Sequence, residues 1–250
     1  STYNIVLSTN ESTVVTEYEP QAKRSDAHQS EAALESAFIK MLGEQGYEYV
    51  SIHNEADLVL NLRKQLERLN QYSFTDKEWE TFFKTKIANA NEGIVEKTRK
   101  IQEDYVQNLT CEDGRTQNIY LIDKKNIHNN RLQVINQYEE GAGNHDTRYD
   151  VTVLVNGLPL VHVELKRRGV AIKEAFNQIN RYQRDSFWAG SGLYEYVQIF
   201  VISNGTFTKY YSNTTRASHI KENDGTSKKH SKKTSNSFEF TSYWADGNNR

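Results

Sequence analysis

Apolar side chains in the first half of the chain recur every three or four residues, which is the spacing of one face of an α-helix. Ser30 is the expected N-cap before the first stripe, and Thr75 and Glu78 form a capping-box pattern before the third. These stripes predict four helices that contribute to a core: Leu34, Phe38, Met41 and Leu42; Leu58, Leu62, Leu66 and Leu69; Trp79, Phe82, Phe83 and Ile87; Ile94, Thr98, Ile101 and Tyr105.

From residue 118 onward the pattern changes to short runs rich in β-branched and aromatic residues, which predict strands. Two of these runs are separated by Asn156-Gly157, the dipeptide most typical of a tight hairpin. A helical stripe from Ile172 to Tyr182 follows the hairpin. Since a strand after a crossover helix can join the same sheet in parallel, we expect an α/β fold with a mixed central sheet flanked by helices. The expected strands cover residues 118–123, 131–138, 149–155, 160–165, 196–203 and 207–212, with further strand-like alternation at residues 2–18.

Length and composition fit a globular fragment. With 250 residues, the chain can form one large domain or one domain with an insertion. Its single cysteine, Cys111, excludes an intramolecular disulfide and fits a reducing compartment. Apolar runs stay well short of the ~20 residues that cross a membrane, and the N-terminal stretch lacks a signal-peptide pattern. We therefore expect a cytoplasmic location and no membrane partner.

The hairpin's second strand, in "LPLVHVELKRRG", ends with an acid and a base. Because strand side chains alternate, Glu164 and Lys166 share a face with Leu160 and His162, while Val161, Val163 and Leu165 lie opposite. The ordinary interpretation of such a pair is a weak surface salt bridge. Antiparallel pairing, however, brings the start of the first strand beside the end of the second, so Asp150 is expected close to both residues.

Two carboxylates and one ammonium group in that arrangement suit phosphodiester chemistry. Mg²⁺ is typically held by one or two carboxylates, keeps several waters and binds substrate phosphate. It can polarise a phosphoryl oxygen and lower the pKa of a bound water, while a nearby lysine orients that water or stabilises developing charge. We therefore predict Asp150 and Glu164 as Mg²⁺ ligands and Lys166 as the catalytic lysine.

The helix after the hairpin carries further candidates. Gln178 and Tyr182 lie four residues apart on one helical face, and Arg181 lies between them in sequence. The ordinary interpretation is a tyrosine half in the core with a solvated neighbour. Beside a phosphate-binding site, the same segment would direct hydrogen-bond donors towards a phosphate.

These motifs resemble known nuclease elements. Asp150, thirteen intervening residues, Glu164, one residue and Lys166 resemble the PD-(D/E)xK motif, with Tyr149 where that superfamily often has proline. Gln178 and Tyr182 resemble the QxxxY element of RecB-like nucleases. The combined pattern "RYDVTVLVNGLPLVHVELKRRG" and "VQIFVISNGTFTKYYSN" resembles the N-terminal endonuclease domain of the R (HsdR) subunit of type I restriction–modification enzymes, over residues 31–212.

The resemblance implies a PD-(D/E)xK restriction-endonuclease-like core with an inserted helical region. It implies an endonuclease domain at residues 1–220, with a catalytic core at about 30–212 and the insertion at about 55–109. Residues 221–250 would then be a polar linker or loop towards helicase-like motor domains. An acid on the first core helix also belongs to the wider pattern, and Glu31 is preferred over Glu35, one turn later.

The implied function is Mg²⁺-dependent cleavage of double-stranded DNA inside an ATP-driven complex with methyltransferase and specificity subunits. The sequence holds no G-x-x-x-x-G-K-[ST] motif, so ATP would act only through motor domains outside it. The net charge of −2 predicts weak DNA affinity for the fragment alone. Basic residues gather locally, as at Lys166-Arg167-Arg168 and in the lysine-rich segment 221–233, for which a solvated surface is the ordinary interpretation.

Two alternatives stay open at this point. A RecB-like repair exonuclease would use the same acids, lysine and QxxxY pair, and a nuclease-like fold could serve as a non-catalytic docking module. Seven scattered histidines without metal-ligand spacing argue against a zinc site. His162 shares the Glu164 face, and a strand histidine with satisfied hydrogen bonds is the ordinary interpretation.

Overall fold

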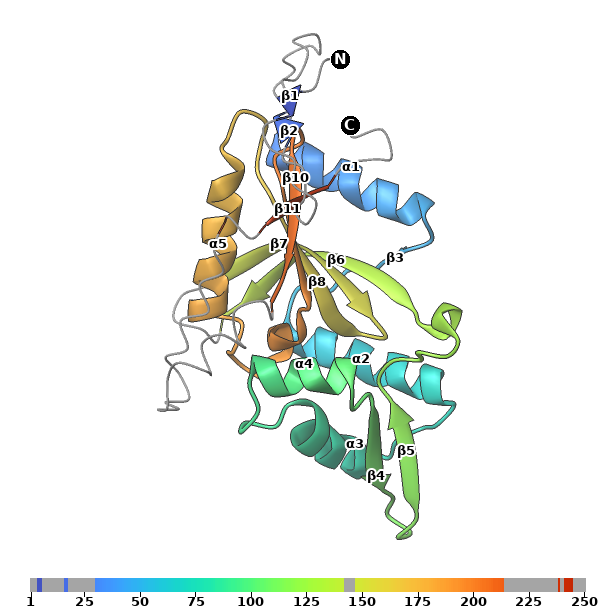
Figure 1. Ribbon diagram of the computed structural model, residues 1–250. Coiled ribbons are helices and arrows are strands. Elements are labelled where there is room, and N and C mark those ends of the chain that lie inside the picture. Colours follow the sequence, from blue (N-terminus) through green and yellow to red (C-terminus); the bar gives the residue numbers. More distant parts are fainter. Residues whose placement is uncertain are drawn as a thin grey trace.

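A seven-stranded mixed sheet with helices on both sides organises the protein, which confirms the predicted α/β class (Figure 1). The computed structural model describes residues 4–5, 16–17, 30–141, 147–213, 238 and 241–244. In the strand-like N-terminal segment, β1 (Asn4–Ile5) pairs antiparallel with β2 (Thr16–Glu17). The lysine-rich segment 221–233 lies outside the described residues. Within the described part of the chain, no helix is both long and apolar enough to cross a membrane.

The central sheet combines antiparallel and parallel pairs. Its order is β11-β10-β9-β8-β7-β6-β3. The pairs β3–β6 and β8–β9 are parallel, which confirms that the strand after the crossover helix joins the sheet in parallel. The strands are β3 (Glu48–Tyr49), β6 (Leu132–Glu140), β7 (Thr147–Val155), β8 (Leu158–Leu165), β9 (Ile199–Ser203), β10 (Thr208–Ser212) and β11 (Ser242–Tyr243).

The β7–β8 hairpin forms where Asn156-Gly157 predicts it. Both turn residues have positive φ, 50° and 85°, as a type I′ turn requires. Asn156 is fully buried, and its side chain accepts a hydrogen bond from the Arg131 N–H at 2.9 Å and donates to Leu121 O at 3.1 Å. The turn is therefore fixed to neighbouring segments, and it is followed by the pairs Val155↔Leu158 and Leu154↔Pro159. An irregularity between Val153 and Leu154 then shifts the register, so that Val151 pairs with Val163.

Each face of the sheet is covered by a helix, and the two layers are separate (Figure 1). Helix α1 (Glu31–Glu44) begins at Ser30, whose Oγ accepts the Ala33 N–H at 3.1 Å. Its apolar side chains pack on a small cluster formed by Val134, Val151, Val163 and Leu165. Helix α5 (Ile172–Asp185) buries Ala175, Phe176, Ile179 and Tyr182 in the main core on the other face.

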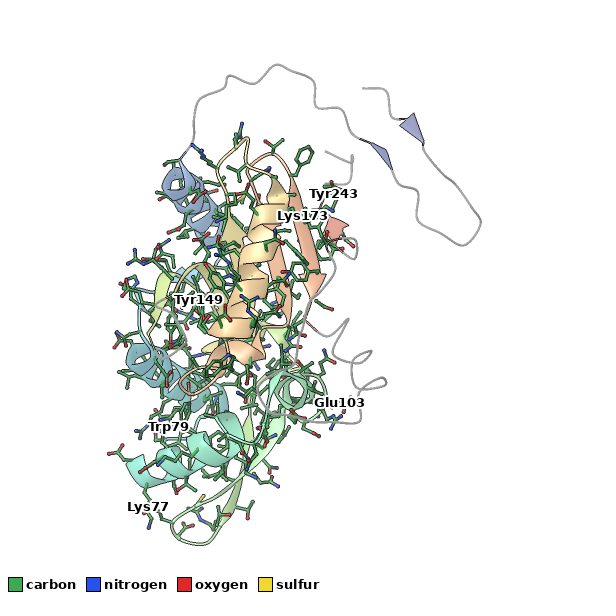
Figure 2. The ribbon with its side chains drawn as sticks, turned by 90° about the vertical axis from the view of Figure 1, so that its left-hand side faces the viewer. Lys77, Trp79, Glu103, Tyr149, Lys173 and Tyr243 are labelled. Carbon is green, nitrogen blue, oxygen red and sulfur yellow. The ribbon has the colours of Figure 1, made fainter. Side chains whose placement is uncertain are left out.

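The remaining helices and a small hairpin lie together beyond one end of the central strands (Figure 1). Figure 2 places Trp79 and Lys77 there, well apart from Tyr149 at the level of the sheet. The capping box of Thr75 and Glu78 forms as predicted. The elements are α2 (Glu55–Asn70), α3 (Asp76–Phe82), a π-helical turn (Phe83–Ile87), α4 (Ile94–Gln102), β4 (Val106–Thr110) and β5 (Thr116–Tyr120).

Several predicted element ends differ from the structure: the strand expected at residues 118–123 is β5, which ends at Tyr120, and two further ends are fixed by distant contacts. Tyr105 lies beyond the end of α4, and its carbonyl accepts the Leu121 N–H at 2.8 Å, next to the β4–β5 hairpin. Tyr196 belongs to a 3-10 turn (Leu193–Tyr196) before β9, and its hydroxyl donates to Ile87 O at 2.7 Å. In both cases a long-range hydrogen bond fixes a residue that local periodicity assigned to the neighbouring element.

The tight approach of the hairpin turn to α2 gives a stability prediction. A Cβ on Gly157 would lie 2.6 Å from the Leu62 Cα, whereas a Cβ on Gly114 would meet nothing within 4 Å, although both glycines have φ near +85°. We expect Gly114→Ala to cost about 1 kcal/mol of backbone strain. Gly157→Ala should cost a further ~1–3 kcal/mol from overpacking. Chemical denaturation of both variants would measure the difference in their free energies of unfolding. Equal losses of stability would show that α2 shifts to make room for the added methyl group.

Candidate active site

Asp150 lies at the boundary between the main core and the apolar cluster under α1. On β7, Tyr149 belongs to the main core and Val151 to the α1 cluster, so the residue between them stands at the boundary. Opposite it, Gln137 on β6 has φ of 51°, a local departure from regular strand geometry. The Oδ2 atom of Asp150 accepts the backbone N–H of Leu165 at 2.9 Å. This bond across the hairpin fixes the carboxyl group beside the end of β8.

Glu164 is fully buried and contacts three charged or polar side chains. Its carboxyl interacts electrostatically with that of Asp150, whose pKa it raises. Its Oε1 accepts from Lys166 Nζ at 3.3 Å, and its Oε2 lies 3.3 Å from His162 Nε2. The structure therefore brings together the acid, acid and lysine that the sequence singled out, and their catalytic role stays a prediction.

Burial makes this pair of carboxyls hard to ionise. Loss of hydration is the main reason that the pKa values of Asp150 and Glu164 are both raised, each to about 7. The negative charge of Glu164 raises the pKa of Asp150 further, while the Leu165 N–H and Lys166 act in the opposite direction. Two carboxylates at this place, once ionised, need more positive charge than Lys166 supplies.

The donor chemistry fits Mg²⁺, because two carboxylates leave room for waters and a phosphate in its coordination sphere. Asp150 and Glu164 are the residues that would hold it. Among the described residues, no group of three or more His, Cys, Asp or Glu side chains is placed to hold a metal ion.

Helix α1 contributes Glu31 to the edge of the site. The Oε1 atom of Glu31 accepts the backbone N–H of Arg167 at 3.2 Å, and its charge adds to the raised pKa of Glu164. Glu35 instead accepts amide hydrogen bonds from Asn136 and Gln137, both at 2.5 Å. Of the two acids considered for the site, Glu31 is the one beside the end of β8.

Gln178 and Tyr182 form a contact on α5. Gln178 Nε2 donates to the Tyr182 hydroxyl, which donates to the Arg148 carbonyl at 3.1 Å. Burial raises the pKa of Tyr182 above its ordinary value, and the Glu164 carboxylate adds to this, while the charge of Arg181 acts against it. Arg181 itself is exposed. The pair thus connects the helix to β7 two residues before Asp150.

His162 differs from the expectation of a satisfied strand histidine. It is fully buried, and its Nδ1 atom has no hydrogen-bond partner among the described residues. Burial lowers the pKa of His162 to about 4, so the ring is neutral at ordinary pH. Strand alternation signalled its position two residues before Glu164, but no sequence pattern could show that one ring nitrogen would lack a partner.

Comparisons with known proteins show clear relatives. A family model described as "Type I restriction enzyme R protein N terminus" matches residues 28–219. The chain is 46% identical over 245 residues to the type I restriction enzyme EcoprrI endonuclease subunit of Escherichia coli, covering 98% of this chain and 73% of that protein.

Two staphylococcal proteins are also similar. The chain is 40% identical over 191 residues to the SsaAORF53P endonuclease subunit of Staphylococcus saprophyticus. It is 39% identical over 192 residues to the SauMW2ORF169P endonuclease subunit of Staphylococcus aureus. These matches cover 74% and 75% of this chain and 20% of each relative, so the relatives extend well beyond the matched region.

The raised pKa values predict that the carboxyl pair destabilises the metal-free fold. The pKa of Asp150 is higher in the folded protein than its ordinary value of 3.8. Its contribution to folding stability is therefore fully present below the ordinary pKa and is lost as the pH rises through the folded pKa of about 7. Asp150→Asn cannot ionise, so with a chelator at pH 8 it should stabilise the protein by on the order of 2 kcal/mol. At pH 5.5, where Asp150 is protonated, the difference in stability between Asp150→Asn and the original protein should be smaller.

Asp104→Asn, at an exposed position, is the matched control and should change the melting temperature at neither pH. Thermal melts at both pH values measure the effect. An Asp150→Asn variant no more stable than the original protein at pH 8 would contradict the electrostatic cost assigned to the pair.

Proposed function

Because this chain belongs to the family of type I restriction enzyme R protein N-terminal domains, we propose that it is the Mg²⁺-dependent endonuclease module of such a subunit and hydrolyses phosphodiester bonds of double-stranded DNA. The observation that carries the proposal is the gathering of Asp150, Glu164 and Lys166 at the end of the β7–β8 hairpin. A site that keeps one fully buried and one half-buried carboxyl beside a lysine is costly unless a cation binds there.

Each residue has a task in the proposed reaction. Asp150 and Glu164 hold Mg²⁺, which when bound polarises a phosphoryl oxygen and lowers the pKa of a water. The Lys166 ammonium, 13% exposed and 3.3 Å from Glu164, orients the attacking water and stabilises charge that develops on the phosphate. Glu31 adds negative charge at the edge of the site. Arg181, exposed on α5, is a candidate for binding DNA phosphate.

The remaining parts of the proposal concern the whole protein. The module spans residues 1–220, with a core at about 30–212 and the helical insertion at about 55–109, and residues 221–250 connect it to motor domains. ATP would be hydrolysed in those domains, since the chain has no P-loop motif. Methyltransferase and specificity subunits are the proposed partners, in the cytoplasm. The family match favours this over a repair exonuclease, and cleavage of circular DNA without ends would distinguish the two.

Alanine substitutions test the proposed chemistry. In the reconstituted complex of the full-length subunit, Asp150→Ala, Glu164→Ala and Lys166→Ala should each abolish DNA cleavage, by a factor of about 10² or more. ATP hydrolysis and translocation should continue, because the motor lies in other domains. Loss of soluble protein in all three variants would instead indicate a structural charge cluster.

Tyr182 offers a finer test. Tyr182→Phe keeps the ring's packing and removes the hydroxyl that contacts Gln178 and the Arg148 carbonyl, so the fold should lose only about 0.5–1.5 kcal/mol per bond. Cleavage should fall by more than this loss of stability explains. The control is Tyr211→Phe, because the Tyr211 hydroxyl is buried without a hydrogen-bond partner among the described residues. If both variants nick DNA at the original rate, Tyr182 is only a core residue.

A further inference from the structure

We propose that His162 is a positioning residue for the metal site, in which its Nε2–H donates to Glu164 Oε2 and orients that carboxylate. This inference rests on the proposed function, because it assigns the orientation to a ligand of the proposed Mg²⁺. The geometry behind it is the 3.3 Å separation between Nε2 and Oε2 of two fully buried side chains.

The surroundings select one tautomer of the ring. Nε2 faces a carboxyl oxygen, which accepts a hydrogen bond, so the proton belongs on Nε2. A proton on Nδ1 would be a buried donor without an acceptor, because Nδ1 has no partner in the described part of the chain. Such unpaired buried polar atoms are rare in folded proteins and concentrate where function requires them. Among the described residues, the polar contact of this ring is therefore directed at Glu164.

Aromatic rings hold the imidazole in this orientation. The rings of Tyr149, Tyr182 and Phe187 lie edge-on to it, with centroids at 5.6, 5.9 and 5.7 Å and interplanar angles of 75°, 79° and 80°. Such edge-to-face contacts favour a fixed ring over a rotating one. Tyr182 also reaches Gln178 through its hydroxyl, so the QxxxY pair supports the histidine from behind.

The two carboxyl oxygens of Glu164 therefore have different partners. Oε2 faces the histidine, and Oε1 faces Lys166. Asp150 is held separately by the Leu165 N–H. Both carboxyls thus have a protein donor that fixes their direction before any ion binds. Partners that orient a metal ligand in this way typically contribute about 10–100-fold to metal affinity.

The test compares three substitutions in the full-length subunit without nucleotide, with Mn²⁺ alone as the probe. His162→Phe fills the aromatic surroundings and removes the donor, and it should weaken Mn²⁺ binding, measured by calorimetry, by at least tenfold. His162→Gln keeps an amide donor near the Nε2 position and should recover most of the affinity. His162→Asn, whose amide is too short to reach Glu164, should bind as weakly as the Phe variant.

Thr152→Val is the matched control. Thr152 is buried opposite His162 in the strand pairing, and its hydroxyl forms a hydrogen bond with the Tyr194 hydroxyl at 3.0 Å. It should destabilise the fold but leave Mn²⁺ affinity within twofold. The Mg²⁺ concentration that gives half-maximal cleavage in the reconstituted complex should rise in His162→Phe by the same factor by which its Mn²⁺ affinity falls.

Three results would overturn the role of His162: unchanged Mn²⁺ affinity in His162→Phe, equal losses in His162→Phe and Thr152→Val, or equal affinity in His162→Gln and His162→Asn. The last comparison decides the matter even if the Phe variant does not fold. Failure of the proposed function gives a different result, since Asp150→Asn would then bind Mn²⁺ as the original protein does.

Discussion

The neighbouring carboxyl groups of the half-buried Asp150 and the fully buried Glu164 set the main physical constraint on this fold. Water would stabilise their charges, but the sheet and its covering helices remove it, and the pKa values of both groups rise towards neutrality as a result. A sheet without a task for these groups would be more stable with apolar residues of similar size. A bound cation would balance their negative charges and so offset the free-energy cost of removing them from water.

The elements around the pair keep it from relaxing. The buried turn at Asn156 and Gly157 fixes the hairpin against α2, and the Leu165 N–H holds Asp150 across the strands. Helix α1 seals the opposite face through a separate apolar cluster and supplies Glu31. Helix α5 brings Tyr182 and its aromatic neighbours behind His162. Packing therefore holds the polar site in one arrangement, which is what electrostatic preorganisation requires.

Features that depend on residues close in sequence could be predicted from the local pattern of side chains. Asn156-Gly157 and strand alternation placed Asp150 beside Glu164 and Lys166, and the capping box at Thr75 marked the start of α3. Features that depend on distant partners were not visible. Tertiary packing gives Gln137, whose amide donates to Glu35, its left-handed conformation. It also leaves Nδ1 of His162 without a hydrogen-bond partner among the residues that the structure describes. For the same reason Tyr196 left its expected strand.

Anomalous diffraction from crystals of the protein soaked with Mn²⁺ tests the central claim most directly. If the carboxyl pair exists to hold a cation, the strongest anomalous peak should lie within coordination distance, about 2.0–2.6 Å, of a carboxylate oxygen from both Asp150 and Glu164. Glu164 Oε2 should still face His162, and Lys166 should point at the ion's open side. A saturating soak that leaves this position empty would contradict the account.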